Sequence, residues 1–238
     1  MSEASETEPA TGTDGTPAEA IDDSPWALQL AARIEKLDPP RTLAVCAATA
    51  LATIALLADE RSAPGGEWHD AVAEWSEVRI RKIVRRGRAS AWERAQDVPG
   101  VTVAHDGAEV RAFVPGRMAS APREIAKLQI QSSPLDVPER VGDVPELAAG
   151  TMVIAVTPAV EMSWGKQAAQ CAHAAQLLWW AGDDDRLAAW DDAGRPVHIV
   201  QSNDDLWGTL EDRAEVRVHD AGFTEIPPGT NTTVAWWS

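Results

Sequence analysis

Residues 162–173 read Met-Ser-Trp-Gly-Lys-Gln-Ala-Ala-Gln-Cys-Ala-His, and this stretch decides how the carboxyl-terminal half of the chain is interpreted. Lys166, Gln170 and His173 are four and three residues apart, so on a helix they project from one side. The alanines between them let the opposite side pack closely. Lys166 falls in the first turn, where unpaired backbone N–H groups favour an anion. The stretch predicts an anion site; an exposed lysine with a hydrogen-bonded core histidine is the alternative.

The segments around this helix alternate between strand and helix patterns. Residues 152–156 form a short apolar run that predicts a buried strand, and the helix itself is predicted over 165–181. Downstream we expect a short helix, a strand, a capped helix and two strands, over residues 186–192, 197–201, 204–213, 216–219 and 232–237. This order predicts an α/β unit, a sheet with helices packed against it.

A second polar cluster follows the strand predicted at 216–219. Residues 220–232 read Asp-Ala-Gly-Phe-Thr-Glu-Ile-Pro-Pro-Gly-Thr-Asn-Thr. The strand ends at Asp-Ala-Gly, and Pro-Pro-Gly turns the chain back into the last strand, so a carboxylate and several hydroxyls gather at one end of the sheet. A tight polar turn is the alternative, because Asp-x-Gly and Pro-Gly are ordinary turn sequences.

Together, the two segments resemble the archaeal/eukaryotic class of peptidyl-tRNA hydrolases. Members of that family carry a Met-Gly-Lys-Gly-Lys loop, then Ala-Ala-Gln-x-x-His on the first helix, and close with Asp-Ala-Gly-x-Thr-x-Ile-x-Pro-Gly-Ser/Thr-x-Thr. The spacing of both motifs matches here, and the resemblance covers residues 151–238. It implies a four-stranded mixed sheet with helices on both faces, a possible homodimer, no metal or organic cofactor, and hydrolysis of the ester in peptidyl-tRNA to free tRNA and peptide.

The resemblance also implies roles for individual residues. The catalytic set is Lys166, Asp220, Thr224 and Thr232, and the substrate-binding set is Gln170, His173, Gly229, Thr230 and Trp164. Ester hydrolysis needs a positioned water, a proton acceptor and donors for the oxyanion. We expect Asp220 to activate the water, with a threonine orienting it, and Lys166 with the helix amides to stabilise negative charge. The roles of Lys166 and Asp220 are exchangeable, because a desolvated lysine can act as a base.

Trp164 departs from the family pattern, since it stands where the family has the first lysine of its loop. Its indole could stack on a base at the tRNA end. A packed loop tryptophan is the equal alternative.

The amino-terminal half carries a different pattern. Residues 1–24 hold seven acids and no Lys or Arg, which predicts a disordered tail. We expect a mostly helical domain over residues 25–130, with helices over 26–37, over 43–57 and around Trp68, Val72 and Trp75, and a small hairpin within 101–114. Residues 131–150, with three prolines and Gly142 among acids, predict a linker to the hydrolase-like domain at 151–238. No internal repeat is found.

Charge and composition limit where RNA could bind. The formal net charge of −16 argues against the whole surface binding nucleic acid. The strong basic patch lies within residues 78–94, and its candidate phosphate-binding side chains are Arg79, Arg81, Lys82, Arg85, Arg86 and Arg88. A solvated helix face is the alternative. Because the hydrolase-like segment is itself acidic, this patch could supply its phosphate contacts.

Two cysteines, Cys46 and Cys171, are too few for a disulfide framework or a thiolate metal site, and no signal segment opens the chain. We therefore expect a cytoplasmic protein. The uncharged run over residues 42–58 favours a buried helix over a membrane span. Two alternatives to the peptidyl-tRNA hydrolase stay open: a non-catalytic RNA- or protein-binding module on the same fold, and an esterase that acts on another acyl carrier.

Overall fold

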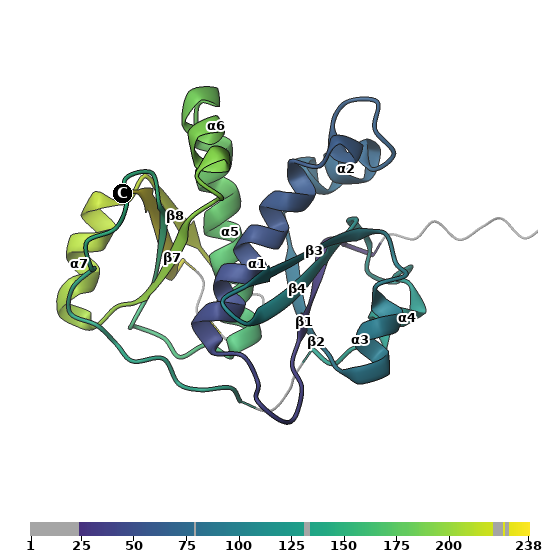
Figure 1. Ribbon diagram of the computed structural model, residues 1–238, viewed down its shortest axis with the longest axis horizontal. Coiled ribbons are helices and arrows are strands. Elements are labelled where there is room, and N and C mark those ends of the chain that lie inside the picture. Colours follow the sequence, from purple (N-terminus) through teal and green to yellow (C-terminus); the bar gives the residue numbers. More distant parts are fainter. Residues whose placement is uncertain (1–23, 79, 131–133, 221–225, 227–228) are drawn as a thin grey trace, which may run out of the picture.

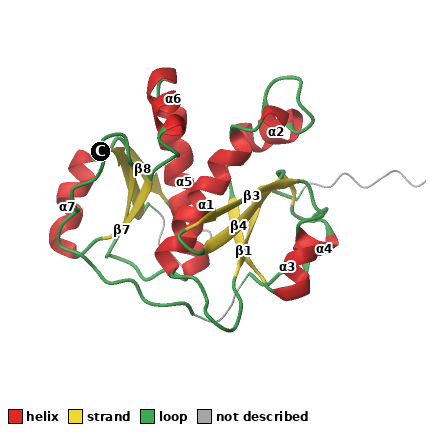
Figure 2. Cartoon of the chain, viewed as in Figure 1, coloured by secondary structure: helices red, strands yellow, loops and turns green. Residues whose placement is uncertain are grey.

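The computed structural model describes residues 24–78, 80–130, 134–220, 226 and 229–238 (Figure 1). The predicted acidic tail therefore lies outside the described residues, apart from Ser24. Two sheets stand on either side of a central pair of helices, and further helices cover the outer faces of the sheets (Figures 1 and 2).

The carboxyl-terminal half is the predicted α/β unit. Its elements are β6 (Met152–Val156), α5 (Trp164–Ala181), α6 (Asp184–Asp192), β7 (Val197–Gln201), α7 (Asp204–Arg213), β8 (Val216–His219) and β9 (Asn231–Trp237). The strand order is β7-β6-β9-β8, with β6 parallel to β7 and antiparallel pairing elsewhere. Met152 and Ile154 pack in one cluster with α5, whereas Val153 and Ala155 pack in another with Leu210 of α7. The predicted mixed sheet with helices on both faces is confirmed.

The amino-terminal half contains a second sheet. Its elements are β1 (Trp26–Arg33), α1 (Thr42–Leu57), a short 3₁₀ turn (Glu60–Ser62), α2 (His69–Val78), β2 (Lys82–Gly87), α3 (Ala89–Ala95), β3 (Gly100–His105), β4 (Ala108–Phe113), β5 (Gly116–Arg117) and α4 (Arg123–Ala126). The strand order is β2-β1-β4-β3, and β5 adds to β1. The predicted helices at α1 and α2 and the β3–β4 hairpin are confirmed.

The helix predicted over residues 26–37 is wrong, because residues 26–33 form strand β1 in the interior of this sheet. Leu28 and Leu30 face α1, and Ala31 packs on the opposite face against α3 and α4. A strand that is buried on both faces is apolar along its whole length, so it lacks the alternation that marks a strand in a sequence.

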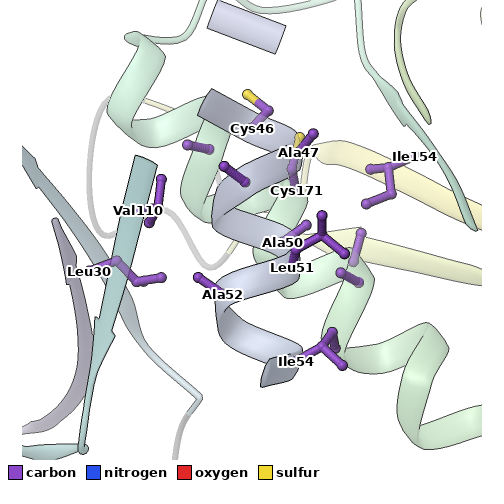
Figure 3. Packing of buried hydrophobic residues seen from close by; sticks show 14 of the residues in the cluster. Leu30, Cys46, Ala47, Ala50, Leu51, Ala52, Ile54, Val110, Ile154 and Cys171 are labelled. Carbon is purple, nitrogen blue, oxygen red and sulfur yellow. The ribbon is translucent and has the colours of Figure 1, made fainter. Parts of the chain in front are cut away.

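The two halves share one hydrophobic core, centred on α1 and α5. Figure 3 shows Leu30 and Val110 from one sheet and Ile154 from the other on either side of these helices. Cys46 of α1 contacts Cys171 of α5 at the crossing. Among the described residues, no helix combines the length and hydropathy that crossing a bilayer requires.

The segment predicted as a linker crosses between the halves without forming a helix or strand over residues 134–150. It is nevertheless attached to both. The carboxylate of Asp136 accepts the N–H of Thr42 at 2.6 Å and so caps α1, and Val141 bridges to Ser202 after β7. The division into separate domains stays a prediction.

Candidate active site

Lys166 lies in the first turn of α5, where the sequence analysis places it. The hydroxyl of Ser163 accepts the backbone N–H of Lys166 at 3.3 Å, and the Ser163 carbonyl accepts that of Gln167 at 2.9 Å. These two helix amides therefore already have acceptors within the chain. Trp164 is 7% exposed and belongs to the core cluster, so base stacking by its indole stays a prediction.

The side chains of Lys166 and Asp220 meet, although they are far apart in the sequence. Lys166 Nζ lies 2.5 Å from Asp220 Oδ2, and Gln170 Nε2 donates to the same oxygen at 2.6 Å. Their side chains are 18% and 7% exposed. The backbone of Asp220 also pairs with the returning chain, through the Thr230 carbonyl at 3.0 Å and the Gly229 N–H at 2.8 Å. A buried ion pair is therefore held between the start of α5 and the end of β8.

Gln170 links this pair to strand β9. Its Oε1 accepts a hydrogen bond from the hydroxyl of Thr232 at 2.9 Å, and its Nε2 donates one to Asp220, so both ends of the amide have a defined partner. Thr232 and the neighbouring Thr233 are fully buried, and the Thr233 hydroxyl donates to the Gln170 carbonyl at 3.2 Å. Thr232 is thus connected to Asp220 through Gln170. Sequence reasoning missed Thr233, which the β9 alternation places on the face towards α5.

His173 lies one turn further along α5. Burial lowers its pKa to about 3, and the positive charges of Lys82 and Lys166 act in the same direction. Its imidazole is therefore neutral at physiological pH and fits a packing or hydrogen-bonding role better than a charged one. Gly229 has φ +81, a backbone conformation that favours glycine in this turn. Thr224 lies outside the described residues.

The candidate phosphate-binding residues do not share one surface. Arg79 lies outside the described residues. Lys82 donates to Gln176 Oε1 of α5, and Arg85, 7% exposed, donates to Gln29 Oε1 at 2.7 Å. These two residues are three apart on strand β2, so their side chains point to opposite faces, and both faces are covered by other parts of the chain. Contact with phosphates stays a prediction for the partly or fully exposed Arg81, Arg86 and Arg88.

In the part of the chain that the structure describes, no three His, Cys, Asp or Glu side chains gather as metal ligands. The described residues therefore form an α/β domain in which a lysine–carboxylate pair at the end of a sheet is held by an amide and a hydroxyl.

Comparison with known proteins places this domain in a family. Residues 150–236 match the family described as peptidyl-tRNA hydrolase PTH2. Proteins named peptidyl-tRNA hydrolase from two strains of Halobacterium salinarum are each 33% identical to the chain over 90 residues, which is 35% of this chain and 80% of the relative. The chain belongs to the PTH2 family of peptidyl-tRNA hydrolases, and the resemblance seen in its sequence is confirmed.

Proposed function

We propose that the chain hydrolyses the ester bond of peptidyl-tRNA and releases free tRNA and the peptide. Membership of the PTH2 family and the names of the halobacterial relatives support this activity. The observation that carries the proposal is the buried pair of Lys166 and Asp220, which come from the two motifs, are 54 residues apart in the sequence and lie 2.5 Å from each other.

In the proposed reaction, Asp220 accepts the proton of the attacking water and Lys166 stabilises the negative charge that develops on the ester oxygen. The direct contact between the two side chains supports this assignment over the reverse one, because a lysine that donates to a carboxylate carries the proton that a base would have to lack. Gln170 and Thr232 are positioning residues, since they hold Asp220 in place through hydrogen bonds.

The experiment measures release of tRNA from N-acetyl-aminoacyl-tRNA. Asp220→Asn is expected to lose about 10²–10⁴-fold in kcat, the usual contribution of a general acid or base. Lys166→Met is expected to lose about 10²–10³-fold, as when one oxyanion donor is removed. Arg41→Met, which breaks an exposed ion pair with Asp106 elsewhere, is the control and is expected to retain the wild-type rate. Wild-type turnover in both site variants, with folding verified by circular dichroism, would reject the proposal.

Two alternatives are separated by the same assay. Retained tRNA binding without any ester cleavage in the wild type would indicate a binding module on the hydrolase fold. Cleavage of a small ester at a rate similar to that of the tRNA substrate would indicate another acyl carrier.

The cytoplasm is the proposed location. Its support is that Cys46 and Cys171 are buried, in contact and unbonded, which fits a reducing compartment. The homodimer that the resemblance implies remains a prediction, to be tested by sedimentation equilibrium. One apolar face of α5 is already covered by α1 of the same chain.

A further inference from the structure

The two halves of the chain have the same topology, although the sequence shows no repeat. The order β1-α1-α2-β2-α3-β3-β4 in the first half corresponds to β6-α5-α6-β7-α7-β8-β9 in the second. The strand orders, β2-β1-β4-β3 and β7-β6-β9-β8, correspond in the same way. Within these orders the first pair of each sheet is parallel and the next two are antiparallel; in the first sheet β5 adds a further antiparallel partner to β1.

The correspondence extends to the register of the strands. Ala32 of β1 pairs with Arg86 and Val110, as Val156 of β6 pairs with Gln201 and Thr233. Val110 in turn pairs with Val103, as Thr233 pairs with Val218. With Ala32 taken as the counterpart of Val156, these pairings align all four strands of the two sheets.

Residues that this alignment matches are buried on corresponding faces of the two sheets. Leu28, Leu30 and Ala32 face α1 in the shared core, as Met152, Ile154 and Val156 face α5. On the outer faces, α3 and α7 take corresponding places at opposite ends of the molecule (Figure 1).

The contacts between the halves are reciprocal. Helix α1 packs on α5, strand β2 contacts α5, and its counterpart β7 contacts α1. Cys46 meets Cys171 where the two helices cross. Each half thus uses the same elements to cover the other, as the two subunits of a twofold dimer do.

A cation–carboxylate pair also recurs, but in an open setting. Arg41, directly before α1, lies 2.7 Å from Asp106, directly after β3; these are the counterparts of the elements that carry Lys166 and Asp220. The side chains of Arg41 and Asp106 are 73% and 57% exposed, against 18% and 7% for the pair in the second half.

The remaining parts of the site are missing from the described residues of the first half. Helix α1 has only threonines as polar residues, so it offers no amide like that of Gln170. Val110 occupies the strand position of Thr233. The two residues Asp106 and Gly107 join β3 to β4, where residues 220–230 join β8 to β9 and carry the family motif.

We propose that residues 26–113 are a second, degenerate copy of the hydrolase fold, which serves as a built-in partner subunit and carries no hydrolytic site. Each polypeptide then has one substrate site, at Lys166 and Asp220. The statement about hydrolysis rests on the proposed function, whereas the number of sites can be measured without turnover.

The test counts sites on the full chain with a non-cleavable probe, an N-acetyl-aminoacyl-tRNA in which an amide replaces the ester. Calorimetric titration is expected to give one equivalent of probe per chain. Two equivalents would overturn the proposal. A wild type that binds one equivalent but cleaves no ester would refute the proposed function alone.

Matched variants test which pair is active. The double variant Arg41→Met/Asp106→Asn is expected to keep kcat within about twofold, because an exposed ion pair contributes little. Lys166→Met/Asp220→Asn is expected to lose about 10²-fold or more. A loss of about tenfold or more in the first double variant, with its circular dichroism spectrum unchanged, would show that the first copy takes part in catalysis and overturn the proposal.

Discussion

Replacing Lys166 with methionine should lower the free energy of unfolding, because Asp220 would stay buried without its ionic partner. Removal of one member of a buried ion pair costs about 3–5 kcal/mol. Gln170 still donates to Asp220 Oδ2 and Lys166 is 18% exposed, so we expect the lower end, about 3 kcal/mol. With an m-value of about 3 kcal/mol/M, the urea midpoint should fall by about 1 M. Fluorescence of the 11 tryptophans reports the transition.

Arg41→Met is the matched control, because the Arg41–Asp106 pair joins the corresponding elements but is exposed. It should change the free energy of unfolding by about 0.5 kcal/mol or less. The double variant Lys166→Met/Asp220→Asn, which removes both charges, should recover much of the loss. Equal midpoints for Lys166→Met and Arg41→Met would refute the reasoning that burial makes the first pair important for stability.

Four further outcomes are expected. The pKa of folded His173 is about 3, below the ordinary value of 6.5, so the unfolded chain binds more protons between these values. Stability should therefore fall as the pH drops from 6.5 towards 3, and His173→Gln should reduce that fall in urea titrations at pH 7 and 5. Burial lowers the pKa of Lys82 from 10.5 to about 7, so its contribution makes stability rise with pH between those values, and Lys82→Met should flatten that rise. Thr232→Val leaves the Gln170 Oε1 atom without this donor; it should cost about 1–3 kcal/mol in unfolding experiments, and kcat should fall by up to about 10²-fold. A fragment of residues 150–238 exposes the apolar face of α5, and size-exclusion chromatography should show self-association; a stable monomer would contradict the importance of the shared core.

The local spacing of residues was enough to predict the second half of the fold. The four- and three-residue intervals from Lys166 to Gln170 and His173 place them on one side of a helix, whatever the rest of the chain does. The segment after β8 similarly indicated that Asp220 lies at the end of a sheet. Both inferences depend on covalent geometry over a few residues, which the sequence states directly.

The sequence could not show which basic side chains of residues 78–94 are buried and which are exposed. Arg85 and Lys82 are as basic in sequence as Arg88, yet their side chains bond to Gln29 and Gln176 inside the molecule. Both faces of β2 are covered, one by α5 and the other by α3 and α4, and this packing depends on α4 and α5, which lie outside the basic segment.

The sequence by itself determined the membership of residues 151–238 in a family, because a motif is a pattern of residue identities at covalent intervals. Only the tertiary structure decided that β1 is a strand, that Thr233 joins the site and that the first half repeats the second. Strand pairing and burial select residues by shape and polarity, so two copies can retain the same backbone topology after nearly all shared identities are gone.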